Sequence, residues 1–300
     1  MNNRLGILGA PLTVAQPNEG VDFGPGSIRY AGLFDRLNDL GLAYKDYGDV
    51  PVINKRTNGV DPKTNLRNLD HVASANEMIA DYVYDLKKQG DVPLILGGDH
   101  SIAIGTLAGL SQFYSNLGVI WFDAHADLNR GETSPSGNIH GMSLGVSLGM
   151  GHERLTSIHG QEAKIKPEHT IIIGARSVDE GERQVIREQG IRVYTMHDIE
   201  THGITWVMND ALEYLNGKVD GVHLSLDVDG IDPNHTPGTG TPVVGGPSYR
   251  EAHLAMSMLY NAGVLTSAEV VEVNPLLDEG NRTAEVAVDM IASLYGEKHV

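Results

Sequence analysis

The feature of this 300-residue chain that most restricts its fold is a regular alternation of short apolar runs with longer amphipathic stretches. Runs rich in β-branched and other apolar residues predict strands, at residues 5–8, 42–48, 92–98, 117–123, 170–175, 191–196, 221–227 and 267–273. Helical spacing of apolar residues lies between them, as in residues 24–41, 68–90 and 248–263. About eight βα units in one uninterrupted series predict an α/β protein, a parallel sheet covered by helices, in a single domain over residues 1–300.

This alternation alone is compatible with two architectures, an open doubly wound sheet and a closed eight-stranded barrel. In both, ligands bind at the carboxyl ends of the strands. The residues that follow the predicted strands are therefore the first candidates for a functional site.

Four of the predicted strands end in acidic or histidine side chains, in segments that read LILGGDHS, VIWFDAHAD, HLSLDVDGIDP and EVVEVNP. Because parallel strands bring their carboxyl ends to one edge, we expect these side chains to lie near one another. They are Asp99 and His100, then Asp123, His125 and Asp127, then Asp227 and Asp229, and finally Glu272.

The segment WFDAHADLN places Asp123, His125 and Asp127 at every second position. Alternate residues of an extended segment point the same way, so these three side chains should converge. Two carboxylates held close together repel each other unless a positive charge lies between them. The pattern favours a metal ion at this point.

Each group of acids also has a structural explanation. Asp99 is a favourable N-cap for a helix that begins in DHS, and Asp227 with Asp229 fits a polar turn before Gly230. A short motif such as DAHAD also occurs by chance in surface loops. Taken together the groups favour metal binding, because an unpaired carboxylate at the end of a buried strand is costly and three strands repeat the arrangement.

The donor atoms indicate which metal is bound. Two histidines and four aspartates, in a chain with no cysteine, suit manganese better than a soft ion. Six side chains are more than one catalytic ion needs. Divided between two ions, with Asp123 and Asp227 placed to bridge them, they resemble two-metal sites with ions about 3.5–4 Å apart, which activate a water near neutral pH.

Six segments of the sequence resemble the ureohydrolase family, and within it most closely the arginases. They are GGDHS, FDAHADLN, SGNIHG, SLDVDGIDP, TGTPVVGG and EVNP, in this order along most of the chain. The resemblance implies an open, eight-stranded parallel sheet flanked by helices on both faces. It also implies two Mn²⁺ ions per chain, and a bridging hydroxide that converts L-arginine to L-ornithine and urea.

The resemblance also implies how the ligands are divided between the two ions. One ion would be held by His100, Asp123, Asp127 and Asp227. The other would be held by Asp123, His125, Asp227 and Asp229.

Three residues are expected to act in catalysis. Glu272 resembles the family's glutamate that anchors the substrate, because a carboxylate can pair bidentately with a planar guanidinium; the alternative is a structural ion pair. His140 in GNIHG resembles the family's proton shuttle; the alternative is an ordinary hydrogen-bonded loop histidine. The third residue is Asp127, which is expected to act as a metal ligand. Histidines outside the motifs, such as His223 and His299, are expected in ordinary core or surface positions.

The remaining motif positions resemble the residues with which arginases bind the α-carboxylate and α-amino groups of the substrate. Asn129, Ser134, Ser136 and Asn138 offer neutral partners for the α-carboxylate, and Asp179 and Glu182 offer charges for the α-amino group. Thr241 in TGTPVVGG is a further expected contact. Agmatine lacks the carboxylate, so this loop favours arginase over the alternatives within the family, agmatinase and guanidinobutyrase.

Two other classes of function are compatible with parts of the sequence. GVSLG at residues 145–149 fits the G-x-S-x-G motif of serine hydrolases, but that motif needs a strand that runs into a sharp turn. Here it continues a helical pattern, and a chain with 36 glycines matches such a motif by chance. The second alternative, a non-catalytic metal-binding relative, is disfavoured by the presence of both Glu272 and His140.

The net charge of −17 argues against nucleic acid or an anionic membrane surface as a partner. No run approaches the eighteen apolar residues of a membrane span, and the N-terminus lacks the pattern of a signal peptide. With no cysteine, the chain is expected in the reducing cytoplasm. The family resemblance further implies a homo-oligomer, either a trimer or a hexamer.

Overall fold

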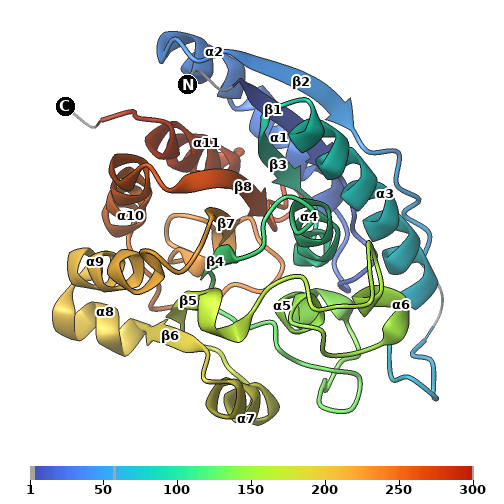
Figure 1. Cartoon of the computed structure of the whole chain (residues 1–300). Coiled ribbons are helices and arrows are strands. Elements are labelled where there is room, and N and C mark those ends of the chain that lie inside the picture. The colour runs from blue at the N-terminus through green and yellow to red at the C-terminus, as the bar shows by residue number, and fades with distance from the viewer. Residues whose placement is uncertain (1–3, 57–58, 299–300) are drawn as a thin grey trace.

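The computed structural model describes residues 4–56 and 59–298, and within them eight strands form one sheet (Figure 1). The strands are β1 (Leu5–Ala10), β2 (Tyr44–Asp49), β3 (Val92–Gly97), β4 (Leu117–Phe122), β5 (Thr170–Ala175), β6 (Arg192–Thr195), β7 (Gly221–Asp227) and β8 (Leu265–Val271). Their order is β2-β1-β3-β8-β7-β4-β5-β6, and every pairing is parallel. In the described part of the chain β2 and β6 are the two edges, so the sheet is open and is not a barrel.

The helices occupy the intervals that the sequence pattern predicted. They are α1 (Gly24–Tyr30), α2 (Leu33–Asp39), α3 (Leu69–Lys88), α4 (Ala103–Leu110), α5 (Ser143–Ser147), α6 (Glu153–Thr156), α7 (Glu180–Gln189), α8 (Met196–His202), α9 (Ile204–Leu215), α10 (Tyr249–Ala262) and α11 (Arg282–Leu294). Over residues 4–56 and 59–298, none of them combines the length and the apolar character that crossing a membrane requires.

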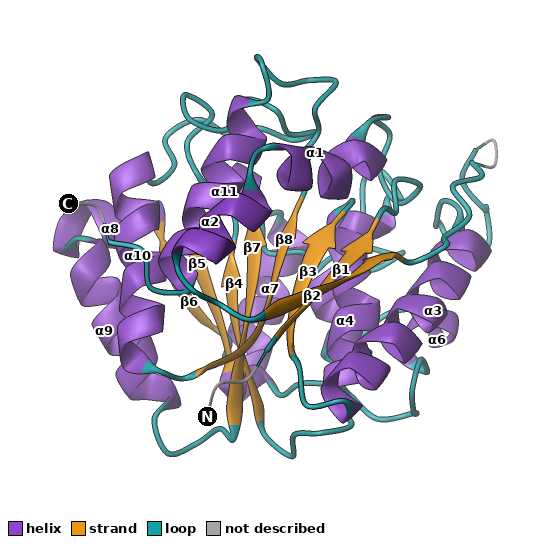
Figure 2. Ribbon diagram, turned by 90° about the horizontal axis from the view of Figure 1, so that it is seen from above, coloured by secondary structure: helices purple, strands orange, loops and turns teal. Residues whose placement is uncertain are grey.

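The sheet is covered on both faces because successive side chains of a buried strand point in opposite directions. In β4, Val119 and Trp121 belong to a core that includes residues of α3 to α7. Ile120 and Phe122 belong to a second core, with residues of α1, α2 and α8 to α11. Figure 1 shows α3 to α6 on one side of the sheet and α9 to α11 on the other, and Figure 2 shows the strands between the helices. The expected open α/β fold is confirmed.

Two details of the helices bear on the sequence predictions. The segment 24–41, predicted as one helix, is divided into α1 and α2, because Gly32 adopts a left-handed conformation (φ 95°) that a continuous helix excludes. The serine-hydrolase motif lies in α5, where Ser147 is buried and its Oγ donates to the carbonyl oxygen of Ser143 at 2.9 Å. The motif therefore lacks the strand and sharp turn that a nucleophilic serine of this kind needs, in agreement with the helical pattern of its sequence.

The strand order also determines where the acidic residues lie. β3, β8, β7 and β4 are consecutive neighbours at the centre of the sheet. These are the four strands whose carboxyl ends the sequence singled out. Their acids and histidines therefore lie at one central point of the sheet edge, as expected.

Candidate metal centre

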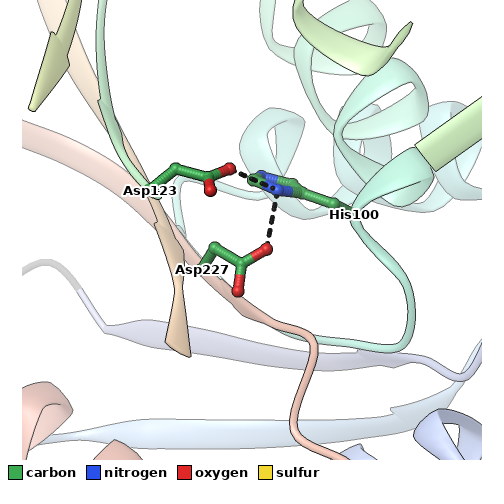
Figure 3. Close-up of side chains that lie close together, drawn as sticks. All are labelled: His100, Asp123 and Asp227. Carbon is green, nitrogen blue, oxygen red and sulfur yellow. Dashed lines mark ion pairs between the residues drawn. The ribbon is translucent and has the colours of Figure 1, made fainter. Parts of the chain in front are cut away.

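Three of the predicted ligands converge at this edge of the sheet (Figure 3). His100 follows β3, Asp123 follows β4, and Asp227 is the last residue of β7. The Nδ1 atom of His100 lies 3.1 Å from Oδ2 of Asp123 and 3.1 Å from Oδ2 of Asp227. All three side chains are buried, and their ligand atoms are close enough to share one metal ion.

A second group shares Asp123 with the first. The Nδ1 atom of His125 lies 3.4 Å from Oδ1 of Asp123 and 3.2 Å from Oδ2 of Asp229, and these three residues also form a possible metal site. Asp123 thus presents one carboxylate oxygen to each group. Asp127 joins the first group, with Oδ2 at 3.2 Å from Nδ1 of His100. The structure therefore brings all six predicted ligands together.

Asp227 makes the same two kinds of contact as Asp123. Its Oδ2 faces His100, whereas its Oδ1 accepts a hydrogen bond of 2.7 Å from the backbone N–H of Asp229. Asp123 makes a similar local contact, since its Oδ1 accepts from the backbone N–H of His125 at 2.7 Å. These bonds to the residue two positions ahead fix the turns that follow β4 and β7.

The backbone carries strain at two of the predicted site residues. Asp127 (φ 51°) and Glu272 (φ 66°) adopt the left-handed conformation, which is uncommon for residues other than glycine and concentrates at functional sites. The side chain of Asp127 in this conformation lies 3.2 Å from Nδ1 of His100. In Glu272 the same conformation accompanies a backbone hydrogen bond to the carbonyl oxygen of Gly98, at 2.9 Å.

The electrostatics of the cluster favour a bound cation. Burial raises the pKa of Asp227, and the charges of Asp229 and Asp123 raise it further. Burial and the charge of Asp123 likewise raise the pKa of Asp127. These carboxylates repel one another in a site that excludes water, so their ionised forms require positive charge between them.

Two further contacts fix the ring of His100. Its Nε2 lies 2.8 Å from Oγ of Ser225, and that hydroxyl donates its single hydrogen to Oε1 of Glu269 at 2.7 Å. Ser225 must therefore accept the hydrogen of Nε2, which leaves Nδ1 to face the carboxylates. The ring also stacks on Trp121 at a centroid distance of 4.0 Å. Such outer contacts are typical of metal-binding histidines.

The pKa of His100 also favours a bound cation in this cluster. Burial lowers its pKa, but close contact with Asp123 and Asp227 outweighs burial and raises the pKa well above the ordinary value. In the absence of a cation, a proton on Nδ1 of His100 faces three carboxylates. Nδ1 is buried and makes no hydrogen bond of good geometry with any described residue. A metal ion would replace this proton.

A cavity of about 240 Å³ opens beside the cluster. Its wall includes four of the six predicted ligands, namely His125, Asp127, Asp227 and Asp229. It also includes His140 and every residue predicted to hold the amino-acid end of the substrate, which are Asn129, Ser134, Ser136, Asn138, Asp179, Glu182 and Thr241. The size and lining of the cavity suit a small polar molecule.

Two serine hydroxyl groups at the cavity wall can still donate a hydrogen bond to a ligand. The Oγ of Ser134 accepts from the backbone N–H of Gly137, and the Oγ of Ser136 accepts from that of Asn138. Neither hydroxyl donates to another described residue, so each keeps its own hydrogen for a further acceptor. The serines are therefore arranged as donors, which suits an anionic group in the cavity.

The two acids predicted to meet an α-amino group differ in their surroundings. The carboxylate of Glu182 is buried and accepts the backbone N–H groups of Leu128 and Asp179, at 3.0 and 2.8 Å. It caps α7 and anchors the loop after Asp127. Asp179 accepts from Nδ2 of Asn129 at 2.9 Å. Thr241 donates to Oδ2 of Asp229 at 2.9 Å and thus supports a predicted ligand.

Glu272 does not line the cavity and is almost completely buried. Its Oε1 lies 3.3 Å from Nδ1 of His140 and accepts from the backbone N–H of His100 at 2.8 Å. Its Oε2 accepts from Nε2 of Gln16 at 2.7 Å. The structure therefore places Glu272 behind His140, and a direct pairing with a guanidinium remains a prediction.

Some residues that support the site were not predicted. Gln16, Trp121 and Ser225 each contact a predicted site residue. For Ser225 there was a signal, because Ser225 lies two positions before Asp227 in an otherwise apolar strand and therefore points the same way. Gln16 lies in a distant loop and had none. Asp99 is the N-cap that the sequence predicted, since it accepts from the backbone N–H of Ser101.

His223 and His299, which lie outside the motifs, were expected in ordinary core or surface positions. His223 is buried in the core, with Nδ1 at 2.9 Å from Oγ of Ser267, which agrees with the expectation. His299 lies outside the described residues.

Comparison with known proteins identifies the family. Residues 3–296 match the family model described as the Arginase family. An arginase of Bacillus subtilis (strain 168) is 55% identical over 298 residues, which cover 99% of each chain. A structure of Bacillus caldovelox arginase has a TM-score of 0.96 and 54% identity, over 99% of this chain and 100% of that one. Entamoeba histolytica arginase in complex with L-ornithine has a TM-score of 0.91 and 34% identity, over 98% and 99%.

Proposed function

This chain belongs to the arginase family of hydrolases, and we propose that it converts L-arginine and water to L-ornithine and urea. The observation that carries the proposal is the pair of histidine and aspartate groups that share Asp123 beside a small polar cavity. Relatives with the name arginase match over nearly the whole chain, and one was solved with L-ornithine.

We propose that the six ligands hold two Mn²⁺ ions, with Asp123 between them. His100, Asp123, Asp127 and Asp227 would hold one ion, and Asp123, His125, Asp227 and Asp229 would hold the other. The buried oxygen-rich donor set, free of sulfur, supports this assignment. When bound, such an ion pair supplies hydroxide near neutral pH to attack the guanidinium carbon.

Three side chains of the protein would then act on the substrate. Burial lowers the pKa of His140, but contact with Glu272 outweighs burial and raises it, so His140 keeps a proton that it can transfer to the departing amine. Glu272 would anchor the guanidinium and hold His140 in place. Asp127 would position an ion at the cavity wall.

The cavity wall would bind the amino-acid end of arginine. The free hydroxyl hydrogens of Ser134 and Ser136, with the amides of Asn129 and Asn138, would receive the α-carboxylate. Asp179 and Glu182 would provide negative charge for the α-amino group, and Thr241 would complete the wall. Agmatine would leave these donors without an acceptor, which favours arginine over the substrates of agmatinase or guanidinobutyrase.

The experiment that tests this function is urea release from L-arginine and agmatine, measured side by side after manganese loading. We expect efficient release from arginine and little from agmatine. A preference for agmatine would replace arginase with another activity of the family. No release from any guanidino compound would favour a non-catalytic metal-binding relative.

We further propose that residues 1–300 act as one catalytic domain, that the chain forms a trimer or hexamer, and that it works in the cytoplasm. The single sheet shared by all eight strands supports the first point. Light scattering on the purified protein tests the second, and fractionation of cells of the source organism tests the third.

A further inference from the structure

Thr133 contacts the predicted carboxylate-binding residue Asn129 without lining the cavity itself. Its Oγ1 lies 2.9 Å from Oδ1 of Asn129 and donates to it. The same Oγ1 accepts from the backbone N–H of Arg130 at 2.9 Å. The hydroxyl thus connects the side chain of Asn129 to the backbone of its own loop.

These contacts determine which way the Asn129 amide faces. An ionised carboxylate can only accept, so the atom of Asn129 that lies 2.9 Å from Oδ2 of Asp179 is the amide nitrogen. The amide oxygen then faces Thr133, which has a single hydrogen to give. The other acceptor in reach of that hydrogen, the carbonyl oxygen of Arg130, lies farther away at 3.4 Å.

This orientation has a consequence for the cavity. The oxygen of the Asn129 amide is occupied by Thr133, and one amide hydrogen is occupied by Asp179. The group that Asn129 keeps for a ligand is its second amide hydrogen, which is a donor. If the amide turned over, it would present an acceptor and repel an anionic group.

The position of Thr133 is fixed by helix α7. A Cβ atom added at Gly181 would lie 2.9 Å from Cβ of Thr133, so the helix backbone packs directly against the threonine. The same helix begins just after Asp179 and contains Glu182. Thr133 therefore joins the loop that carries Asn129 to the helix that carries the acids of the cavity.

We propose that Thr133 is a positioning residue for substrate specificity, whose hydroxyl holds the Asn129 amide with its N–H toward the α-carboxylate of the substrate. This inference rests on the proposed arginase function, because it assumes that the substrate carries that carboxylate. It adds a residue that acts through Asn129 and does not itself touch the substrate.

The test compares Thr133→Val, which keeps the shape but removes the hydroxyl, with the matched control Thr133→Ser, which keeps the hydroxyl. For the valine variant we expect kcat/KM for arginine to fall about tenfold, as the loss of a partly buried hydrogen bond implies, and kcat/KM for agmatine to fall far less. The serine variant should retain most of the preference for arginine. Bound manganese should be the same in all three proteins.

A binding measurement gives a second readout that does not need turnover. L-Ornithine and putrescine differ by the α-carboxylate, so calorimetry should show that Thr133→Val weakens ornithine binding and leaves putrescine binding nearly as it was. If the valine variant is unstable, Thr133→Ala is tested in the same way.

Equal losses for arginine and agmatine with manganese intact would overturn the role of Thr133. So would a serine variant as impaired as the valine one, because the hydroxyl would then be irrelevant. A wild-type protein that prefers agmatine would overturn the proposed function itself, and with it this inference, before any variant is compared.

Discussion

The Nδ1 atom of His140 lies 3.3 Å from Oε1 of Glu272, and the two groups shift each other's pKa in opposite directions. Burial lowers the pKa of His140, but the contact with Glu272 outweighs it and raises the pKa. Burial raises the pKa of Glu272, but contact with His140 outweighs it and lowers the pKa. The contact therefore favours the protonated form of His140 at the wall of the cavity.

Replacement of His140 should separate proton transfer from metal binding. His140→Asn should keep its manganese and release urea roughly a hundredfold more slowly, since general acid-base groups typically contribute that much or more. Elemental analysis of the variant measures its manganese content, and steady-state kinetics on the same sample measures its rate of urea release. If the variant loses manganese, His140 belongs to the coordination shell instead.

Replacement of Asp229 should affect the ions directly. The manganese-loaded wild type should contain about two metal ions per chain, and Asp229→Ala should lose metal and most of its activity, because the second group loses one of its three members, the carboxylate that lies 3.2 Å from His125. Glu132→Gln is a matched control, since it removes an exposed charge from the nearby loop. Full activity with one ion per chain would rule out the two-metal assignment.

Removal of the metal should make the stability of the protein depend on pH. The pKa values of His100 and His125 are raised in the fold, because carboxylate contacts outweigh burial. Stabilisation from such a histidine is complete below its unfolded pKa of about 6.5 and is lost as the pH rises through the folded value. The raised pKa values of Asp127 and Asp227 act in the same direction, since ionisation of these buried acids destabilises the fold.

The melting temperature of the chelator-treated protein should therefore fall by several degrees between about pH 6.5 and pH 9. Manganese binds the deprotonated ligands, so the stabilisation that it provides should grow over the same range. Calorimetry of both forms at several pH values gives the comparison. Parallel curves for the two forms would show that the cluster does not control the stability.

The carboxylate-binding loop should be tested through the choice of substrate. The wild type should prefer arginine over agmatine by about 10⁴ or more in kcat/KM. Asn129→Ala combined with Ser136→Ala should reduce kcat/KM for arginine far more than for agmatine and leave the bound manganese unchanged. Equal losses with the metal intact would mean that this loop does not recognise the carboxylate.

The strands were predictable because their apolar runs are short and separated by helical spacing. Residues 170–175 and 221–227 form strands with the predicted bounds. The order of the strands was not predictable from this pattern, since long-range pairing leaves no local signal. The division at Gly32 was missed for a similar reason, because a glycine inside a helical pattern is usually tolerated.

The ligands were predictable because acids and histidines that follow buried strands are rare without a compensating charge. The residues that contact and support these ligands were not predictable. Gln16 reaches Glu272 from the other end of the sequence, and Thr133 is one of several polar residues in its loop. Glu182 lies at the cavity wall, and its contact with an α-amino group stays a prediction. Both its carboxylate oxygens accept backbone N–H groups, a use that sequence spacing does not reveal.

The central place of β3, β8, β7 and β4 in the sheet has a consequence for the synthesis of this protein. The proposed ion pair needs Asp123 together with Asp227, which ends β7, and Asp229, which follows it. A partly synthesised chain that lacks its last third would therefore be unable to bind both ions. With the proposed ligand set, metal loading would come after translation of β7. A ribosome-bound nascent chain that stops before Asp227 should be unable to compete for manganese in the cell.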